Sequence, residues 1–312
     1  MIDTKNLRTA YGMTLAGLGE KYGNIVVLEA DLGKSTQSIL FTKKFPERSF
    51  EMGIAEQNMA ATAAGLALAG KMPFIHSFAV FAAGRTFDQL RNSICIPNLN
   101  VRICGSSCGL SDFGDGKTHQ GIEDMAIMRA IPNMAVFQPA DAVETVGIVE
   151  GLVEWKGPAY IRINRNDLPI VMREDRAYRL GQVTRLREGT DIAIFATGAM
   201  VSKSLEAAEG LAKEGLSCRV LNVACLKPLD LQAVIAHARG VKAIVTAEEH
   251  TVIGGLGSAV LEALRLTRHA PLETVGIQDQ FGTSCESYDG LLDCYGLTMA
   301  GIVGAAHRAI DA

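Results

Sequence analysis

The stretch AEQNMAATAAGLALAGKMPFI, residues 55–75, indicates how this chain folds. Its first part, 55–69, consists mainly of small residues and contains no proline, which favours a closely packed helix. The run at 72–75 is apolar and follows Gly70 and Lys71, as expected of a short buried strand. A helix that leads directly into a buried strand is typical of parallel strands joined by helical crossovers.

The same alternation extends in both directions along the chain. Strands are predicted at 25–29, 72–75, 99–104, 134–138 and 159–163, and helices at 7–22, 55–69, 82–93 and 142–155. After the charged stretch 172–190, strands are predicted at 192–196, 218–222, 243–248 and 272–277, and helices at 200–214, 230–237, 254–266 and 299–310. The sequence therefore predicts two consecutive α/β domains, 1–185 and 186–312, each with a mainly parallel sheet flanked by helices.

Composition excludes several classes of protein. The 312 residues are 48% apolar and 21% charged, and the net charge of -4 provides no basic field for nucleic acid. The longest uncharged, mainly small and apolar stretch, 59–70, is too short for a membrane span of about 20 residues. The start, MIDTKNLR, does not read as a signal peptide, so we expect a cytoplasmic protein. The seven scattered cysteines form no CxxC pair and predict reduced thiols, with no metal site.

Two neighbouring blocks suggest a site for a flat ring. Glu56 stands where the helix of small residues begins, a position that favours a carboxylate for structural reasons alone. Phe78 and Phe81 are three residues apart at a second transition from strand to helix, so both rings can face one side. Taken singly, these residues are typical of a helix start and of ordinary core, and only together do they suggest a site.

The segment CGSSCGLSDFGDGKTHQGIED, residues 104–124, is the most unusual part of the chain. It is a glycine-rich polar loop after an apolar strand, where open α/β sheets bind ligands. Histidines transfer protons near neutral pH and carboxylates accept hydroxyl hydrogen bonds, which makes His119 and Asp115 candidates. Its GDG resembles the diphosphate and magnesium motif of thiamine enzymes, but no asparagine follows at the required spacing, and we interpret it as a turn.

These blocks together resemble the carboxyl-terminal half of transketolase, in the form that some organisms make as a separate subunit. The resemblance covers nearly the whole chain. It rests on the ordered blocks LRTAYGMTLAGLG, EADLGKSTQSILFTKKFPERSFEMGIAEQNM, PFIHSFAVFAAGRTFDQLR, GDGKTHQGIEDMAIMRAIPNMAVFQPAD, YIRINRNDLPI, FATGAMVSKSLEAA, LKPLD, AEEHTVIGGLGSAV and FGTS. It implies a pyrimidine-binding domain followed by the family's carboxyl-terminal domain.

The resemblance implies that thiamine diphosphate binds between this chain and a partner. Glu56 would hydrogen-bond a pyrimidine ring nitrogen and thereby promote deprotonation of the thiazolium carbon, while Phe78 and Phe81 would stack on the pyrimidine and Asp31 would lie nearby. The partner, an N-terminal transketolase subunit with its own GDG motif, would hold the diphosphate and Mg²⁺ or Ca²⁺. An α2β2 heterotetramer is expected.

The resemblance also implies a substrate site for a sugar. Its terminal phosphate would be held by residues matching Arg8, Ser35 and Arg165, a substrate hydroxyl would be read by Asp115, and His119 would assist catalysis. Ser107 departs from the family, which commonly has a histidine there, and this puts the donor's terminal group in doubt. For the glycines at 254–257 in the second domain, we favour a structural role over an effector site.

Three functions are compatible with this sequence. The first is the C-terminal subunit of a two-component transketolase, which moves a two-carbon ketol unit from a ketose to an aldose. The second keeps the cofactor but changes the reaction, as in a 2-oxoacid dehydrogenase E1 β chain or a deoxyxylulose-phosphate synthase. The third is a regulatory subunit without catalysis, which the intact set of candidate residues disfavours.

Overall fold

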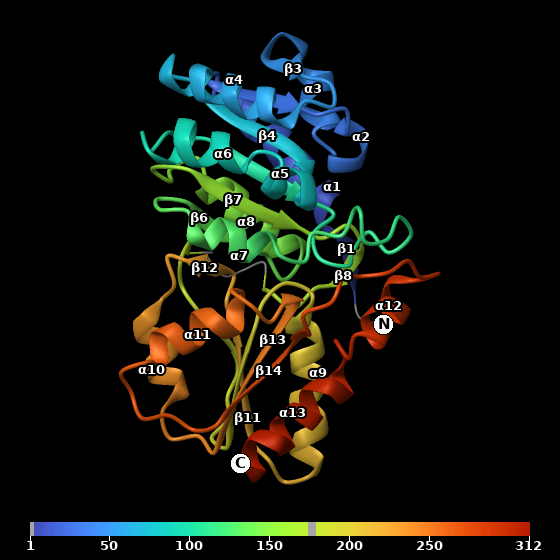
Figure 1. Cartoon of the computed structure of the whole chain (residues 1–312), viewed down its shortest axis with the longest axis vertical. Coiled ribbons are helices and arrows are strands. Elements are labelled where there is room, and N and C mark those ends of the chain that lie inside the picture. The colour runs from blue at the N-terminus through green and yellow to red at the C-terminus, as the bar shows by residue number, and fades with distance from the viewer. Residues whose placement is uncertain (1–2, 174–178) are drawn as a thin grey trace.

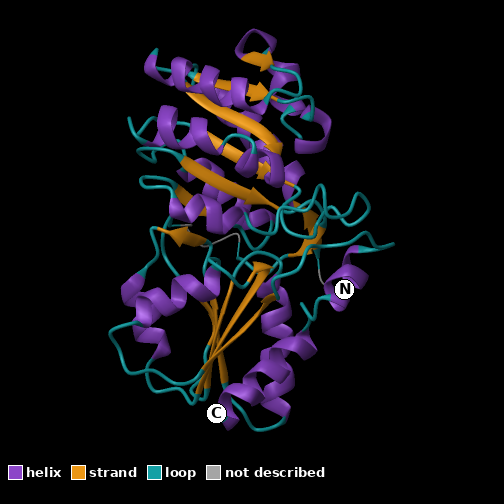
Figure 2. Cartoon of the chain, viewed as in Figure 1, coloured by secondary structure: helices purple, strands orange, loops and turns teal. Residues whose placement is uncertain are grey.

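The computed structural model of the chain describes residues 3–173 and 179–312. Two α/β domains lie end to end, with the N-terminal domain at the top and the C-terminal domain below it in Figure 1. Each domain has a central sheet with helices on its faces, as the strands in Figure 2 show. The predicted fold class is therefore confirmed.

The first domain is built on a seven-stranded sheet in the order β12-β6-β7-β5-β4-β2-β3. Its strands run parallel except β12, which pairs antiparallel with β6. Its elements are β1 (Thr4–Asn6), α1 (Leu7–Lys21), β2 (Ile25–Glu29), α2 (Gly33–Thr36), α3 (Ile39–Lys44), β3 (Ser49–Glu51), α4 (Glu56–Leu68), β4 (Met72–Phe78), α5 (Ala79–Gly84), α6 (Phe87–Gln89), a π-helical turn (Leu90–Cys95), β5 (Arg102–Ser106), α7 (Asp124–Ala130), β6 (Ala135–Phe137), α8 (Ala142–Gly151), β7 (Ala159–Ile163) and β8 (Asp167–Pro169).

Strand β2 shows why the strands of this sheet are apolar throughout. All five of its residues are buried, because helices cover both faces of the sheet. Ile25 and Val27 pack in a cluster with residues of α1 and α8, while Val26 and Leu28 pack in another cluster with residues of α4 and α7. Successive side chains of a strand point to opposite faces, so each face needs its own apolar set.

The second domain has a five-stranded sheet in the order β14-β13-β10-β11-β9, parallel except for β9. Helices α9 and α13 contribute to one buried cluster, and α10 and α11 to another that continues into the first domain. The elements are β9 (Thr184–Arg187), β10 (Ile192–Ala196), α9 (Met200–Lys213), β11 (Cys218–Asn222), β12 (Cys225–Lys227), α10 (Leu231–Ala238), β13 (Ala243–Thr251), α11 (Leu256–Leu264), β14 (Leu272–Ile277), α12 (Tyr288–Cys294) and α13 (Met299–Asp311).

The two domains share structure across their boundary. The predicted boundary at residue 185 falls within β9, which already belongs to the second sheet. Strand β12 comes later in the chain but joins the first sheet, where Cys225 lies opposite Phe137 of β6. A strand of the C-terminal half thus completes the sheet of the N-terminal half.

The predicted helix at 82–93 is the clearest difference from the sequence-based expectation. The structure divides this stretch between the end of α5, the short α6 and a π-helical turn. Gly84 has a low helix propensity, and the Thr86 hydroxyl donates a hydrogen bond to the Ala82 carbonyl at 2.5 Å. Both features weaken a regular helix close to the point where this one is interrupted.

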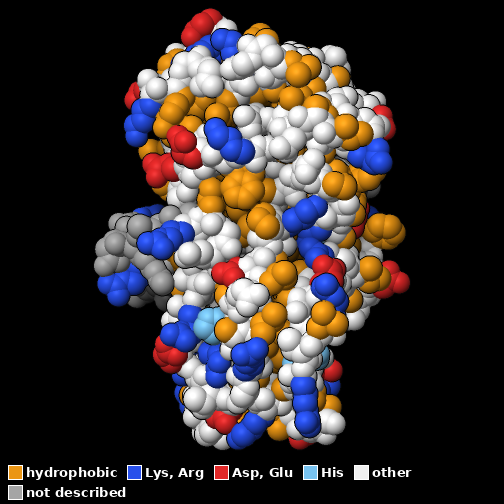
Figure 3. All heavy atoms as spheres, turned by 90° about the vertical axis from the view of Figure 1, so that its left-hand side faces the viewer, with side chains coloured by type: hydrophobic (Ala, Val, Ile, Leu, Met, Phe, Trp, Pro, Cys, Tyr) orange, Lys and Arg blue, Asp and Glu red, His pale blue; other side chains and the backbone are white. Residues whose placement is uncertain are grey.

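The surface carries both charges and apolar side chains. In the part of the chain that is described, no helix combines the length and apolar character needed to cross a membrane. Figure 3 shows apolar side chains gathered across one face of the first domain among scattered lysines and arginines. Ile54 and Leu68 near the two ends of α4 are 74% and 73% exposed. Contiguous exposed apolar patches often mark an interface, whereas single exposed apolar side chains are common.

A buried ion pair ties the first domain together. Arg162 of β7 and Asp124 of α7 lie 2.9 Å apart and are essentially removed from water. Arg162 also donates to the backbone carbonyls of Gly121 and Glu249, each at 3.0 Å, and the Tyr160 hydroxyl donates to Asp124. A buried charge that loses its partner is strongly destabilising.

We expect Arg162→Met to lower the free energy of unfolding by about 3–5 kcal/mol, because Asp124 would remain buried without a counter-charge. The control is Lys44→Met, which breaks a pair with Glu20 whose side chains are 51% and 59% exposed. Exposed pairs contribute about 0–1 kcal/mol. Urea unfolding measures both values, and equal losses for the two variants would contradict the assigned role of Arg162.

Candidate active site

The parallel strands of the first sheet bring the candidate residues to one edge. The carboxyl ends of parallel strands lie at the same edge of a sheet, where α/β proteins bind ligands. Asp31 and Ser35 follow β2, and Phe78 and Phe81 lie at the end of β4 and in α5. Ser107, Asp115 and His119 lie in the β5–α7 loop (107–123), and Arg165 follows β7.

Glu56 opens α4 and is buried, with 3% of its surface exposed. Arg85 donates from Nη1 to its Oε1 at 2.7 Å, and the Ser77 hydroxyl is 3.5 Å from the same oxygen. Within residues 3–173 and 179–312, the other oxygen, Oε2, makes no hydrogen bond. A surface hollow is lined by Ile54, Ala55, Glu56, Gln57, Asn58 and Arg85. The carboxyl group thus has one engaged oxygen and one available oxygen.

Three rings form a second group beside this carboxylate. Phe78 and Phe81 are nearly parallel, with an angle of 16° and 6.2 Å between their centroids. His119 presents an edge-on arrangement to both rings, with centroids 6.2 Å and 5.5 Å away. The Arg85 guanidinium lies over Phe81, 4.1 Å from the ring centroid. Arg85 therefore connects Glu56 to the aromatic group. The structure brings together four residues that were predicted as site residues, which are Glu56, Phe78, Phe81 and His119.

Two arginines form a third group. Arg8 donates to the backbone carbonyl of Ser35 at 2.8 Å, and Arg165 pairs with Asp112 at 2.5 Å. Burial and the nearby Arg165 both lower the pKa of Arg8, and its buried Nε has no hydrogen-bond partner among the described residues. An anion between these guanidinium groups would relieve their mutual repulsion.

A buried carboxyl group shapes the loop that carries Asp31 and Ser35. Glu29, the last residue of β2, accepts hydrogen bonds from the hydroxyls of Thr36 and Ser38. Asp31 is exposed, has a φ of 61°, and donates its backbone N–H to Glu51. Burial raises the pKa of Glu29 to about 7, although the two hydroxyls oppose this shift.

Ser107 and Asp115 differ in their surroundings. Ser107 is completely buried at the start of the β5–α7 loop and has a φ of 52°. In the part of the chain that the structure describes, its hydroxyl has no hydrogen-bond partner. Asp115 is exposed near the tip of the same loop. In this structure the Ser107 hydroxyl is therefore closed off from solvent, whereas the Asp115 carboxylate is open to it.

Sequence reasoning missed Arg85, which is the group that links Glu56 to the rings. A usable signal existed, because Arg85 follows Phe81 by four residues, a spacing that places two side chains on one face of a helix. It also missed that Asp112, a residue of the same glycine-rich loop, pairs with Arg165. No residue pattern in the sequence could have shown that pairing, since the two residues lie 53 positions apart.

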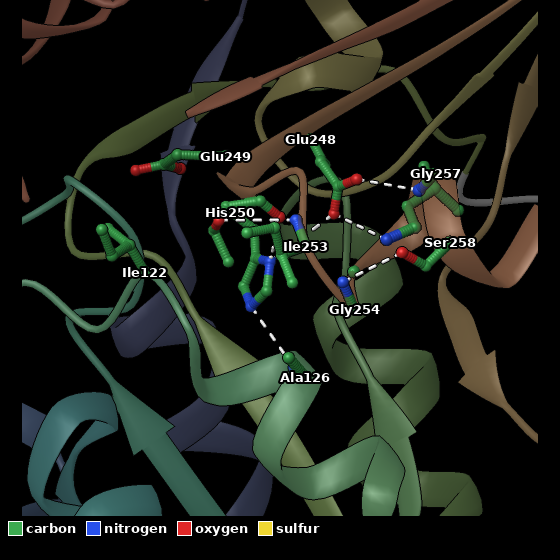
Figure 4. A network of polar contacts seen from close by, with 12 residues as sticks. Ile122, Ala126, Glu248, Glu249, His250, Ile253, Gly254, Gly257 and Ser258 are labelled. Atoms are coloured by element: carbon green, nitrogen blue, oxygen red, sulfur yellow. Dashed lines mark hydrogen bonds and ion pairs between the residues drawn. The ribbon is translucent and has the colours of Figure 1, made fainter. Parts of the chain in front are cut away.

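In the glycine-rich segment of the second domain, a carboxylate of the protein itself occupies the position at the helix start where an anion could bind. The buried carboxylate of Glu248 accepts the backbone N–H groups of Leu256 and Gly257, at 2.6 Å and 2.8 Å, at the start of α11. Figure 4 shows this side chain directed at Gly257. A helix start that binds an internal carboxylate has no need of an external anion.

Two family descriptions match this chain. "Transketolase, pyrimidine binding domain" matches residues 3–171, and "Transketolase, C-terminal domain" matches residues 181–302. The chain belongs to the transketolase family. The family resemblance inferred from sequence is therefore confirmed, and family membership implies dependence on thiamine diphosphate and a transketolase-type transferase.

Two similar proteins of the transketolase family are named as a section or a subunit of a transketolase. A Methanocaldococcus jannaschii chain provisionally named a transketolase C-terminal section is 44% identical over 296 residues, which span 94% of this chain and 92% of that one. The 6-deoxy-6-sulfo-D-fructose transketolase subunit SqwH of a Clostridium species is 41% identical over 305 residues, or 98% and 94% of the two chains.

A solved structure described as a split gene transketolase, inactive beta4 tetramer, is also similar. It has a TM-score of 0.88 and 48% identity, and the match covers 98% of both chains. These descriptions imply that a transketolase of this type has a separate partner subunit.

We expect the stability of the chain to reflect the Glu29 carboxyl group. The folded chain holds this proton more tightly than the unfolded chain, where a glutamate has a pKa of about 4.3. The stabilisation is therefore complete below about pH 4 and is lost as the pH rises through about 7. In Glu29→Gln, the free energy of unfolding should fall less than in wild type between about pH 4 and 8, and the difference should be at most about 4 kcal/mol.

Urea unfolding across this pH range measures the effect. Glu47→Gln is the control, because the Glu47 side chain is 68% exposed. If Glu29→Gln and wild type showed the same pH dependence, Glu29 would not hold its proton as described.

Proposed function

We propose that this chain is the C-terminal subunit of a two-component transketolase that transfers a two-carbon ketol unit from a ketose to an aldose. The observation that carries the proposal is the linked set of Glu56, Arg85, Phe81, Phe78 and His119 at one sheet edge. Family membership and the similarity to separate transketolase chains support it.

The residues fit the pyrimidine ring of thiamine diphosphate. A flat heterocycle would pack against the nearly parallel rings of Phe78 and Phe81. The available Oε2 of Glu56 would form a hydrogen bond with a ring nitrogen of that heterocycle. The cofactor, when bound, supplies an electron sink for the two-carbon fragment. Arg85 would keep the Glu56 carboxyl group oriented, and Asp31 would lie near the same edge. Water would be excluded by the buried setting of Glu56.

The arginine pair suits a substrate with an anionic end. Arg8 and Arg165 would bind the terminal phosphate of a sugar, with the Ser35 loop held against Arg8. Asp115 and His119 would face the sugar from the β5–α7 loop, where His119 would transfer a proton to or from a substrate oxygen. Ser107 would contribute only after a local rearrangement, since it is closed off here.

The partner in this proposal is an N-terminal transketolase subunit. It would supply the GDG motif, which holds the diphosphate with Mg²⁺ or Ca²⁺, and would form an α2β2 heterotetramer with this chain. The exposed Ile54 beside the Glu56 hollow suits burial against such a partner. The similar solved structure is described as inactive in its beta4 form, which fits a need for a second kind of subunit.

We expect Glu56→Ala to lower kcat for ketol transfer by at least about 100-fold in the complex with the partner subunit, because the ring nitrogen loses its carboxyl group. Glu154→Ala, at an exposed position, is the control. The assay uses a ketose donor and an aldose acceptor, with pyruvate as the alternative donor. Circular dichroism checks folding, and a folded Glu56→Ala complex with normal turnover would contradict the role.

We expect Arg165→Ala to raise KM for a phosphorylated ketose by about tenfold, because a charge-assisted hydrogen bond is lost. KM for an uncharged ketose should change little, and the exposed Arg91→Ala variant should match wild type with both donors. Steady-state kinetics with the two donors measures the difference. An equal change in KM for both ketoses would contradict the assignment of Arg165 to the anion site.

A further inference from the structure

The end of strand β13 reaches from the second domain into the first. Thr251 donates its backbone N–H to the Ile122 carbonyl at 2.8 Å, and the Ala126 N–H points to His250 Nε2 at 3.4 Å. Figure 4 shows His250 directed toward Ala126, while Glu249 extends to the other side of the strand from Glu248. Glu248 and His250 also lie near each other, with 3.7 Å between Glu248 Oε2 and His250 Nδ1, whereas Glu249 has a separate set of partners.

Glu249 binds the β5–α7 loop directly. Its Oε1 accepts the backbone N–H of Leu110 at 2.7 Å. Its Oε2 accepts hydrogen bonds from the Tyr288 hydroxyl at 2.7 Å and from Asn164 Nδ2 at 3.1 Å. The carboxylate is completely buried, so these bonds are not shared with solvent.

The approach of Glu249 to the loop depends on Gly109. Gly109 has a φ of 61°, in the left-handed region that favours glycine. A Cβ atom at this position would lie 2.6 Å from Glu249 Oε1. The backbone of the loop is thus fitted around this one carboxylate.

A second contact from the C-terminal domain holds the far part of the same loop. Gln120 donates from Nε2 to the Asp112 carbonyl at 3.1 Å and to the Thr283 carbonyl at 2.9 Å. Cys285 donates its backbone N–H to the Phe113 carbonyl at 2.8 Å. Both ends of the segment that carries Asp115 are therefore fixed by residues of the second domain.

We propose that Glu249 is a positioning residue for the reaction, acting through the β5–α7 loop. The loop carries Asp115 and His119, and its Asp112 pairs with Arg165, so its conformation sets three groups of the proposed substrate site. The inference rests on the proposed function and extends it, because it gives the C-terminal domain a part in substrate binding. The Leu110 anchor is the contact through which Glu249 acts.

Glu248 provides a matched comparison on the same strand. It is also a completely buried carboxylate that accepts backbone N–H groups, but both of these belong to its own domain. Loss of either carboxylate costs stability, whereas only loss of Glu249 releases the β5–α7 loop. A comparison of Glu249 and Glu248 variants therefore distinguishes an effect on the position of the loop from a general loss of stability.

The first measurement is hydrogen exchange of the full chain by mass spectrometry. In Glu249→Ala, amides in the segment 109–121 should exchange about tenfold faster, because the loop loses the hydrogen bond from the Leu110 N–H to a buried carboxyl oxygen. In Glu248→Ala, exchange in this segment should stay at the wild-type rate, while amides near 256–257 exchange faster. Equal exchange of 109–121 in both variants would overturn the proposal.

The second measurement is kinetics in the complex with the partner subunit. Glu249→Ala should raise KM for the ketose about three- to tenfold with a smaller change in kcat, and Glu248→Ala should leave KM unchanged. Glu249→Gln, which keeps one acceptor oxygen, should fall between wild type and Glu249→Ala. An unchanged KM in Glu249→Ala, with the loop released, would also overturn the positioning role.

If the alanine variants do not fold, the pair Glu249→Gln and Glu248→Gln carries the same test. Faster exchange of 109–121 in Glu249→Gln alone is then expected, and no difference between the two would refute the anchor. Exchange is measured without turnover, so it remains decisive if the wild-type complex transfers no ketol unit. A wild-type complex that transfers no ketol unit would count against the proposed function and not against the role of Glu249 in the loop.

Discussion

The ion pair between Arg162 and Asp124 is the interaction on which the arrangement of both domains depends. A guanidinium and a carboxylate removed from water need hydrogen-bond partners inside the protein. Among the described residues, Arg162 finds them for Nε and Nη2 but not for Nη1. Arg162 reaches the carbonyls of Gly121 and Glu249, and Asp124 receives the Tyr160 hydroxyl. The pair thereby fixes a strand, a helix, the end of the β5–α7 loop and the second domain at one point. The charged pair orients the backbone around it, which an apolar contact would do less specifically.

Periodicity predicted much of the fold because the chain buries its strands on both faces. The strands at 25–29, 159–163, 192–196, 218–222 and 272–277 have the bounds that were predicted. Short elements such as β3 and β12 were not predicted, because three residues leave no period to detect. The helix expected at 82–93 is divided near Gly84 and Thr86, where the Thr86 hydroxyl bonds to the Ala82 carbonyl. Regular burial is visible in a sequence, whereas a local side-chain bond is not.

In the candidate site too, some residues could be predicted from the sequence, whereas the contacts between them could not. Glu56, Phe78, Phe81 and His119 were selected by residue type and family resemblance, and their clustering follows from the shared edge of parallel strands. The ion pairs that organise them, Arg85 with Glu56 and Arg165 with Asp112, depend on how loops pack in three dimensions. The link from Glu249 to Leu110 spans 139 positions of sequence and required the structure.

Strand β12 bears on where a transketolase can be divided into separate genes. It leaves the second domain and pairs with β6, so the first domain alone would lose one edge of its sheet. An exposed strand edge invites pairing with other chains and aggregation. A cut between the two domains of this chain would expose the edge of β6 in one product and leave β12 without its partner strand in the other. The two domains of this chain therefore depend on each other for a complete first sheet.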